Sequence, residues 1–344
     1  MDVVYWRRKA VTSLTGQALK TYLATESRAA EASRLFVVGH PAPDADAVIS
    51  SLFEAWRLTK AGTPAMPLVQ ADTLPREVAW LLGTAADLVP LGDAKNPHLR
   101  LVLTDHHDVA AYPGRVTAVV DHHPVTAETE LTGVEAEIRP VGAATTLVAQ
   151  RIRRDGLVPD AVCARMLLGA ILLDTEGLSP YKVKDEDRET ATWLAALCGE
   201  HPQELYALLQ NELLSERDEN RLFWRDYRRY ESVCAAPSIG FAILKVGADA
   251  PPDREAVRQL LRADAARGGL SVAKIALYRS DGQREEYYLA HGTGAEKFLN
   301  EVLAVGGADA RRTAADEVFL PTTCAHRGRK WYAARLQEIF AKKA

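Results

Sequence analysis

Residues 34–48 read RLFVVGHPAPDADAV, an apolar run that passes through a loop of His, Pro and Asp into a second apolar segment. The run is long enough for one buried strand, and the pattern from Val48 through Leu58 is typical of a helix. A strand that leads into a helix is the repeating unit of sheets with parallel strands. The segment therefore predicts an α/β fold.

Two further apolar runs end in the same way: LVLTDHH begins at Leu101 and VVDHH at Val119. A fourth run, LLGAILLDT, ends on Asp174 and belongs to a segment, 160–173, that looks helical. Strand and helix patterns alternate over residues 17–200, which favours a mostly parallel sheet flanked by helices. Ligands gather at the carboxyl ends of the strands in such sheets, so the polar ends are expected to meet there.

The composition limits the class of protein. A chain of 344 residues with 47% apolar residues is expected to form about two domains. The net charge of -4 argues against a general nucleic-acid binder or a membrane-surface binder, which normally carry a basic excess. No run reaches the roughly 20 apolar residues of a membrane span, and the first residues lack the apolar core of a signal peptide. With four widely spaced cysteines, the expected location is the cytoplasm.

A change of pattern after Gly199 marks a second domain. A charged amphipathic stretch leads there to new strand candidates, IGFAILKV, LSVAKIALYRS and EEYYLAHG, with the hairpin signal SDGQ between the last two. We place the larger α/β domain at residues 1–208. Residues 209–344 are expected to form a smaller α+β domain.

The polar strand ends suggest a site for a pair of divalent metals. Imidazole and carboxylate suit Mn, Fe, Co, Zn or Mg, and the excess of oxygen favours Mn or Mg. A single Asp after a strand is more commonly a helix cap or turn former, and Asp174 could cap the turn after a core helix. Burying so many carboxylates without a cation is strongly unfavourable, however, so we prefer the metal interpretation, with Asp105 between the two ions. The candidate ligands are His40, Asp44, Asp46, Asp105, His122 and Asp174.

Four motifs, GHPAPDADAV, LVLTDHHD, VVDHHP and LLGAILLDTEGLSP, resemble in order and interval those of the DHH phosphoesterase superfamily. The C-terminal part lacks the GGGH signature of one accessory domain. Through LLSERDENRLFWRDYRRYE and a closing basic cluster it resembles the DHHA2 type instead. That type accompanies family II inorganic pyrophosphatases, short-chain exopolyphosphatases and prune-like proteins.

The resemblance implies how two Mn ions, or Mg or Co in their place, would be shared among the ligands. One ion would be held by His40, Asp44 and Asp105. The other would be held by Asp46, Asp105, His122 and Asp174, so that Asp105 is common to both.

The resemblance also implies roles beyond the metal ligands. His123 would face the substrate phosphate. His106 and Asp108 are candidates either for proton transfer or for hydrogen bonds that orient the metal ligands. Candidates from the second domain for binding the far phosphate are His326, Arg327, Arg329 and Lys330.

Departures from the pyrophosphatase pattern bear on the substrate. Where pyrophosphatases carry a phosphate-binding Lys at the start of the second domain, this chain has Glu212, and HRGRK, interrupted by Gly328, replaces their SRKKQ. The second motif reads TDHHD in place of Asp-His-Asn-Glu, and the third reads DHHPV, as in prune-like relatives. The chain therefore looks closer to the exopolyphosphatase and prune branch.

The function implied is that of a manganese-dependent phosphohydrolase. It would cleave phosphoanhydride bonds of pyrophosphate or short-chain polyphosphate by attack of a metal-bridging hydroxide. The expected partner is a small phosphate-rich substrate, with no membrane and no general nucleic-acid binding, and a homodimer is left open.

Two alternatives stay open. A phosphodiesterase acting on cyclic nucleotides or short oligonucleotides would present aromatic stacking surfaces in its cleft. A prune-like regulatory binding protein would have no need of a full ligand set. The aromatic residues weighed for stacking are Trp224, Tyr227, Tyr230, Tyr287 and Tyr288.

Overall fold

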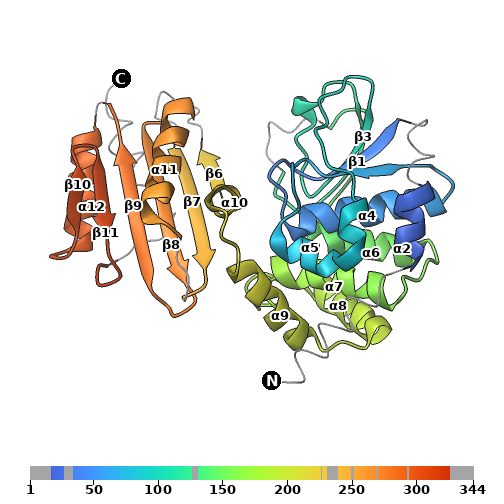
Figure 1. The fold of residues 1–344 in the computed structure, drawn as a ribbon. Helices are drawn as coiled ribbons and strands as arrows, with labels where there is room; N and C mark the ends of the chain where they lie inside the picture. Colours follow the sequence, from blue (N-terminus) through green and yellow to red (C-terminus); the bar gives the residue numbers. More distant parts are fainter. Residues whose placement is uncertain are drawn as a thin grey trace. The chain divides into compact units, whose positions relative to one another are not determined.

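The computed structural model describes residues 17–26, 34–125, 131–225, 227–230, 239–248, 252–268, 270–292 and 294–325. The chain divides into two compact units, Met1–Glu212 and Leu213–Ala344, and each has its own sheet (Figure 1). The boundary that we placed after residue 208 stays a prediction.

The first unit is built on a five-stranded sheet in the order β2-β1-β3-β4-β5. Every neighbouring pair of these strands is parallel, which confirms the α/β fold expected from the alternation of strand and helix. The strands are β1 (Leu35–Val38), β2 (Met66–Leu68), β3 (Arg100–Thr104), β4 (Val116–Asp121) and β5 (Glu135–Ile138).

The register of the sheet brings the motifs together. Val38 of β1 pairs with Leu103 of β3, and Thr104 of β3 pairs with Val120 of β4. The residues that directly follow these three strands therefore lie side by side at one edge, as parallel pairing requires.

The helices of the first unit form two layers. α4 and α6 pack against the sheet, and α7 and α8 cover these helices on the side away from it (Figure 1). The helical elements are α2 (Gln17–Thr21), η1 (Tyr22–Glu26), α4 (Ala45–Lys60), α5 (Arg76–Leu82), η3 (Gly83–Leu88), η4 (Val109–Ala111), α6 (Ala144–Arg154), α7 (Ala161–Asp174), α8 (Asp185–Cys198) and α9 (Pro202–Leu214).

The start of α4 corrects one expectation. The helix begins at Ala45, three residues before the Val48 that the apolar pattern indicated. The reason is the side chain of Asp44, which accepts a hydrogen bond from the Ala47 amide at 3.1 Å and so caps the helix. Asp44 and Asp46 thus lie at the first turn of α4 rather than in a free loop.

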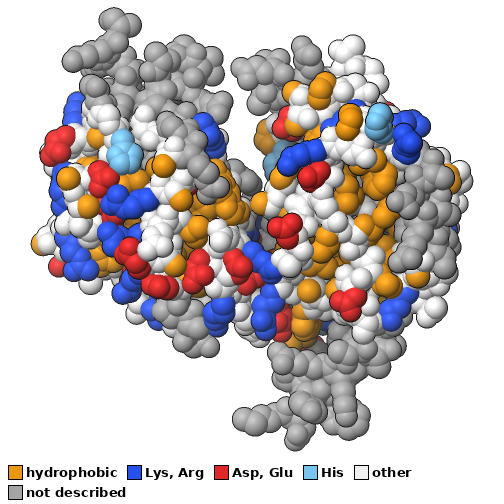
Figure 2. Space-filling model, turned by 45° about the horizontal axis from the view of Figure 1, so that its top comes forward, with side chains coloured by type: hydrophobic (Ala, Val, Ile, Leu, Met, Phe, Trp, Pro, Cys, Tyr) orange, Lys and Arg blue, Asp and Glu red, His pale blue; other side chains and the backbone are white. Residues whose placement is uncertain are grey.

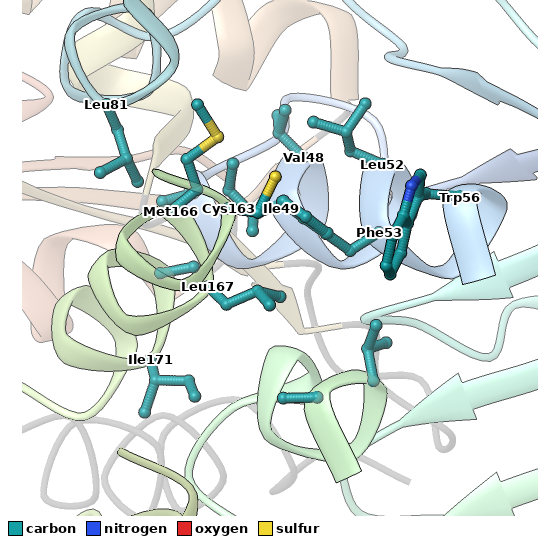
Figure 3. Close-up of a cluster of buried hydrophobic side chains, with 14 of the residues drawn as sticks. Val48, Ile49, Leu52, Phe53, Trp56, Leu81, Cys163, Met166, Leu167 and Ile171 are labelled. Atoms are coloured by element: carbon teal, nitrogen blue, oxygen red, sulfur yellow. The ribbon is translucent and has the colours of Figure 1, made fainter. Parts of the chain in front are cut away.

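The core of the first unit fixes α4 between its neighbours. Ile49 and Phe53 of α4 belong to one cluster of buried side chains with Leu167 and Ile171 of α7, and all four are fully buried (Figure 3). On the sheet side, a Cβ atom at Gly39 would lie 2.6 Å from the Ala47 carbonyl oxygen. Only glycine therefore permits this close approach of β1 and the first turn of α4.

The second unit is a mixed six-stranded sheet in the order β10-β11-β9-β8-β7-β6, which confirms the α+β expectation. β8 and β9 form the hairpin that SDGQ predicted. The strands are β6 (Tyr227–Tyr230), β7 (Ile239–Val246), β8 (Val272–Arg279), β9 (Arg284–Ala290), β10 (Arg311–Ala314) and β11 (Glu317–Leu320), and the helices are α10 (Glu219–Arg225), α11 (Arg254–Gly268) and α12 (Ala295–Gly306).

The surface of the second unit carries paired charges. Acidic and basic side chains are interspersed over its visible face (Figure 2). Glu317, for example, is buried and contacts Arg258 at 2.6 Å and Arg262 at 2.7 Å.

Within the described ranges, no helix has the length and apolar character needed to cross a membrane.

Candidate metal centre

The first unit brings all six candidate ligands to one place. They form two groups, and within each group one ligand atom per residue lies within 4.8 Å of the others. The first group is His40, Asp44 and Asp105, and the second is Asp46, His122 and Asp174. The resemblance implies the same division, except that it also assigns Asp105 to the second group.

Each ligand comes from the end of an element of the first unit. His40 follows β1, Asp105 follows β3 and His122 follows β4. The first turn of α4 supplies two carboxylates, and α7 ends on a third, Asp174. Asp44 is both the cap of α4 and a member of the first group, since its Oδ1 lies 3.8 Å from His40 Nε2.

Asp105 lies between the two groups. Its Oδ2 is 3.3 Å from His40 Nε2, and its Oδ1 is 3.1 Å from His122 Nε2. Oδ1 is buried. The backbone at Asp105 is left-handed, with φ 60°, a strained conformation for a residue with a side chain. A buried carboxylate with one oxygen toward each group fits a ligand that bridges two cations.

Asp46 is held by the N-terminus of a second helix. Its Oδ2 accepts a hydrogen bond from the Ala144 amide at 2.6 Å, and its Oδ1 accepts one from the Thr145 amide at 2.8 Å. These amides open α6, where the helix dipole favours a negative charge. The same Oδ2 lies 3.8 Å from His122 Nε2. Asp46 is therefore held in a fixed orientation beside another member of the second group.

The two histidine ligands are basic in the absence of metal. Burial acts to lower the pKa of His122, but its hydrogen bond to Asp105 and the charges of three carboxylates raise that pKa to about 11. Burial is likewise outweighed at His40, where Asp105 and Asp44 raise the pKa to about 10. Burial raises the pKa of Asp174 to about 7, with a contribution from Asp44. In the metal-free protein, two imidazolium charges would thus partly neutralise the carboxylates of the cluster.

Metal binding is therefore expected to release protons. Only neutral imidazole binds a metal, so at pH 8 manganese should displace about two protons, one each from His40 and His122. The affinity for manganese should then rise by about two orders of magnitude per pH unit between pH 7 and 9. Calorimetric titration with Mn²⁺ in buffers of different ionisation enthalpy measures the proton number directly. A value near zero would contradict these pKa shifts.

The sign of the stability change follows from the same shifts. A histidine whose pKa is raised on folding stabilises the metal-free protein fully below about pH 6.5, the unfolded value. That contribution is lost as the pH rises through about 10 for His40 and about 11 for His122.

His123 lies beside the cluster with its ring partly open to solvent. Its Nδ1 is 2.9 Å from Asp121 Oδ1, and its ring centroid is 4.5 Å from that of His122. The side chain is 40% exposed, which leaves it accessible to a substrate. Contact with phosphate stays a prediction.

His106 and Asp108 are placed differently from the ligands. The ring of His106 packs edge-on against Tyr112 at 6.3 Å, and burial lowers its pKa to about 4. The carboxylate of Asp108 accepts a hydrogen bond from the Ala111 amide at 3.2 Å and caps η4. The catalytic roles suggested for these two residues stay predictions.

The other predicted substrate contacts are not tested. His326, Arg327, Arg329 and Lys330 lie outside the described residues. Glu212, which stands where pyrophosphatases carry a lysine, is buried, and it accepts a hydrogen bond from Arg76 Nε at 3.2 Å.

One cation near the cluster was missed from the sequence. Lys182 Nζ lies 3.4 Å from the Asp174 carbonyl oxygen and 3.6 Å from Glu176 Oε1, and its side chain is 48% exposed. Its charge acts to lower the pKa of Asp174, against the effect of burial. The signal was the YKVK segment directly after the fourth motif.

Curated relatives and a solved structure are similar to this chain. The manganese-dependent inorganic pyrophosphatase of Methanothrix thermoacetophila is 24% identical over 240 residues, which cover 67% of this chain and 76% of the relative. The probable manganese-dependent inorganic pyrophosphatase of Deinococcus radiodurans is 30% identical over 185 residues, 51% of this chain and 57% of the relative. The names of these relatives are consistent with the resemblance to the DHH phosphoesterase superfamily.

The fold of this chain has a solved counterpart. A crystal structure described as a "putative family II inorganic pyrophosphatase" from Methanococcus jannaschii matches with a TM-score of 0.63 and 20% identity. The match covers 89% of this chain and 99% of that one. No protein-family model matches the chain.

Proposed function

We propose that this protein is a manganese-dependent phosphohydrolase that cleaves the phosphoanhydride bonds of pyrophosphate or short-chain polyphosphate. The observation that carries the proposal is Asp105, a buried carboxylate with one oxygen toward each of two ligand groups. Paired metals at such a site are typical of enzymes that attack phosphorus in line. The similarity to proteins named manganese-dependent inorganic pyrophosphatases supports the choice of metal and substrate.

The donor set fits two hard divalent cations. One ion would be held by His40, Asp44 and Asp105, and the other by Asp46, Asp105, His122 and Asp174. Carboxylate oxygens outnumber imidazole nitrogens, which favours Mn, with Mg or Co as alternatives. When bound, the metals would stabilise negative charge on the phosphate oxygens and lower the pKa of a coordinated water.

Side chains of the first unit would position the substrate. His123 is exposed beside the cluster and would contact a phosphate oxygen. Lys182 would add positive charge next to Asp174. Asp46 is fixed by two amide hydrogen bonds, so it would need little reorganisation when a ligand binds.

The phosphodiesterase alternative is not favoured. Tyr287 and Tyr288 are buried in the second unit, and the rings of Trp224 and Tyr227 pack on each other at 4.8 Å. Tyr287 and Tyr288 are core residues of the second unit, and Trp224 and Tyr227 pack against its core. The side chain of Tyr230 lies outside the described set. The complete ligand set likewise weighs against a purely regulatory binding protein. A homodimer and a cytoplasmic location stay predictions.

A phosphate-release panel tests the function. The purified protein with Mn²⁺ should hydrolyse pyrophosphate or tripolyphosphate faster than long polyphosphate, cyclic dinucleotides or pApA. EDTA should abolish the release, because it removes the divalent cations that would lower the pKa of the attacking water. Hydrolysis of the nucleotides alone would favour the phosphodiesterase alternative. Failure on every substrate would rule out the hydrolase.

A further inference from the structure

One buried carboxylate beside the metal ligands receives four hydrogen bonds. Asp121, the last residue of β4, is 0% exposed. Its Oδ1 lies 2.7 Å from the His122 amide, 3.2 Å from the His123 amide and 2.9 Å from His123 Nδ1. Its Oδ2 lies 2.5 Å from Nδ1 of His107. Both oxygens are therefore occupied by nitrogens of neighbouring residues.

These contacts argue against Asp121 as a metal ligand. Asp121 belongs to a group of acidic and histidine side chains close enough to hold an ion. Backbone amides only donate hydrogen bonds, however, so Oδ1 already acts as an acceptor for two of them. The carboxylate thus serves to hold neighbouring groups in place.

The arrangement orients His123. Its Nδ1 is hydrogen-bonded to Asp121, so Nε2 is the ring nitrogen that can contact a ligand. The exposed position of the ring beside the metal groups makes that nitrogen accessible. Nδ1 of the same ring lies 3.7 Å from Asp105 Oδ1, which places His123 next to the carboxylate shared by the two groups.

His107 holds the other side of the same carboxylate. It follows β3 by three residues, so Asp121 connects the ends of two neighbouring strands. The contact to Oδ2 opposes rotation of the carboxylate about its Cβ–Cγ bond. Without His107 a buried, charged oxygen would lose its partner and the carboxylate would reorient.

We propose that His107 is a positioning residue for substrate binding. Through Asp121 it fixes the ring of His123 so that Nε2 meets a phosphate oxygen of the substrate. The inference rests on the proposed function in taking phosphate as the ligand. Residues that act in this way on a binding side chain are worth about 10- to 100-fold when removed.

Two substitutions at His107 separate its hydrogen bond from its bulk. His107→Leu keeps most of the volume and removes the donor. His107→Asn places an amide nitrogen where the imidazole Nδ1 lies and so keeps the donor. His98→Leu is the matched control, because His98 is exposed and its only hydrogen bond among the described residues uses its backbone amide.

The first measurement is binding of inorganic phosphate to the manganese-loaded proteins by calorimetry, with manganese content determined in parallel. His107→Leu should weaken phosphate binding about tenfold or more with unchanged manganese content. His107→Asn should recover affinity to within about threefold of the wild type, and His98→Leu should not change it. The second measurement is the kinetics on pyrophosphate, where His107→Leu should raise KM more than it lowers kcat.

The outcomes separate this inference from the proposed function. Wild-type phosphate affinity in His107→Leu, or equal weakening in the Leu and Asn variants, would overturn the positioning role while leaving the hydrolase in place. A loss of manganese in the Leu variant alone would also overturn it, because His107 would then support the metal ligands instead. If the wild type hydrolyses none of the phosphoanhydrides but its phosphate binding still depends on His107, the function fails and the positioning role stands.

Discussion

Asp105→Asn is expected to lower the rate of phosphate release from pyrophosphate by about 10³-fold, since a loss of about 4 kcal/mol is typical when one partner of a buried charge pair is removed. The physical reason is that Asp105 supplies one oxygen to each ligand group. An amide has one oxygen and no charge, so it can serve only one group. The same variant should bind less than two manganese ions per chain, which elemental analysis after gel filtration measures.

The metal-free protein provides a second readout for this variant. With Asp105 neutral, His40 and His122 lose the hydrogen bonds and the charge that raise their pKa values. Fewer protons should then be released when manganese binds at pH 8. Asp87→Asn is a suitable control, because Asp87 is an exposed aspartate of the same unit. Normal metal content and normal activity in Asp105→Asn would show that Asp105 does not bridge.

Glu54→Gln is expected to destabilise the first unit by about 3 kcal/mol, the lower end of the cost of breaking a buried ion pair. Glu54 is fully buried in α4. It contacts Arg57 at 2.7 and 2.8 Å and Arg151 of α6 at 3.1 Å. Arg57 reaches Asp155 in turn at 2.5 Å, and the network lines a cavity of about 510 Å³. The neutral amide leaves two buried guanidinium groups with less negative charge between them.

Calorimetry of the full chain measures this effect. A loss of about 3 kcal/mol should lower the unfolding temperature of the first unit by roughly 6 to 12 °C. The kinetics of the folded protein should be unchanged, because Glu54 lies two turns along α4 from the ligand Asp46. Glu189→Gln, at an exposed glutamate of α8, is the control. A change below about 1 °C would show that the buried network contributes little.

The sequence was sufficient to predict the sheet and to bring the candidate metal ligands together. Each of three apolar runs is a strand, and each ends on its Asp or His, which is local information. Parallel pairing then places all carboxyl ends at one edge, so the ligands meet without any knowledge of loop geometry. The same reasoning could not give the start of α4, because Asp44 was taken as a loop residue and its capping bond to Ala47 was not foreseen.

The neighbouring histidines of TDHHD show what could not be predicted from the strand pattern. His106 and His107 are adjacent and chemically identical, and we named the first as the catalytic candidate. In the structure His107 binds Asp121, whereas His106 packs against Tyr112. The chain leaves β3 through the left-handed backbone of Asp105, and that turn decides which ring faces which neighbour.

The sequence by itself thus determined which residues end the strands and, through charge and residue type, that the edge they form suits a pair of metals. The tertiary structure alone decided three contacts. Asp121 accepts hydrogen bonds from His107 and His123, Lys182 contacts the Asp174 carbonyl oxygen, and Glu54 of α4 forms an ion pair with Arg151 of α6. The physical reason is the distance along the sequence between the residues that interact. Strand and helix patterns arise from neighbours along the chain, whereas the direction of a side chain beyond a strand end is fixed by hydrogen bonds to residues far away in sequence.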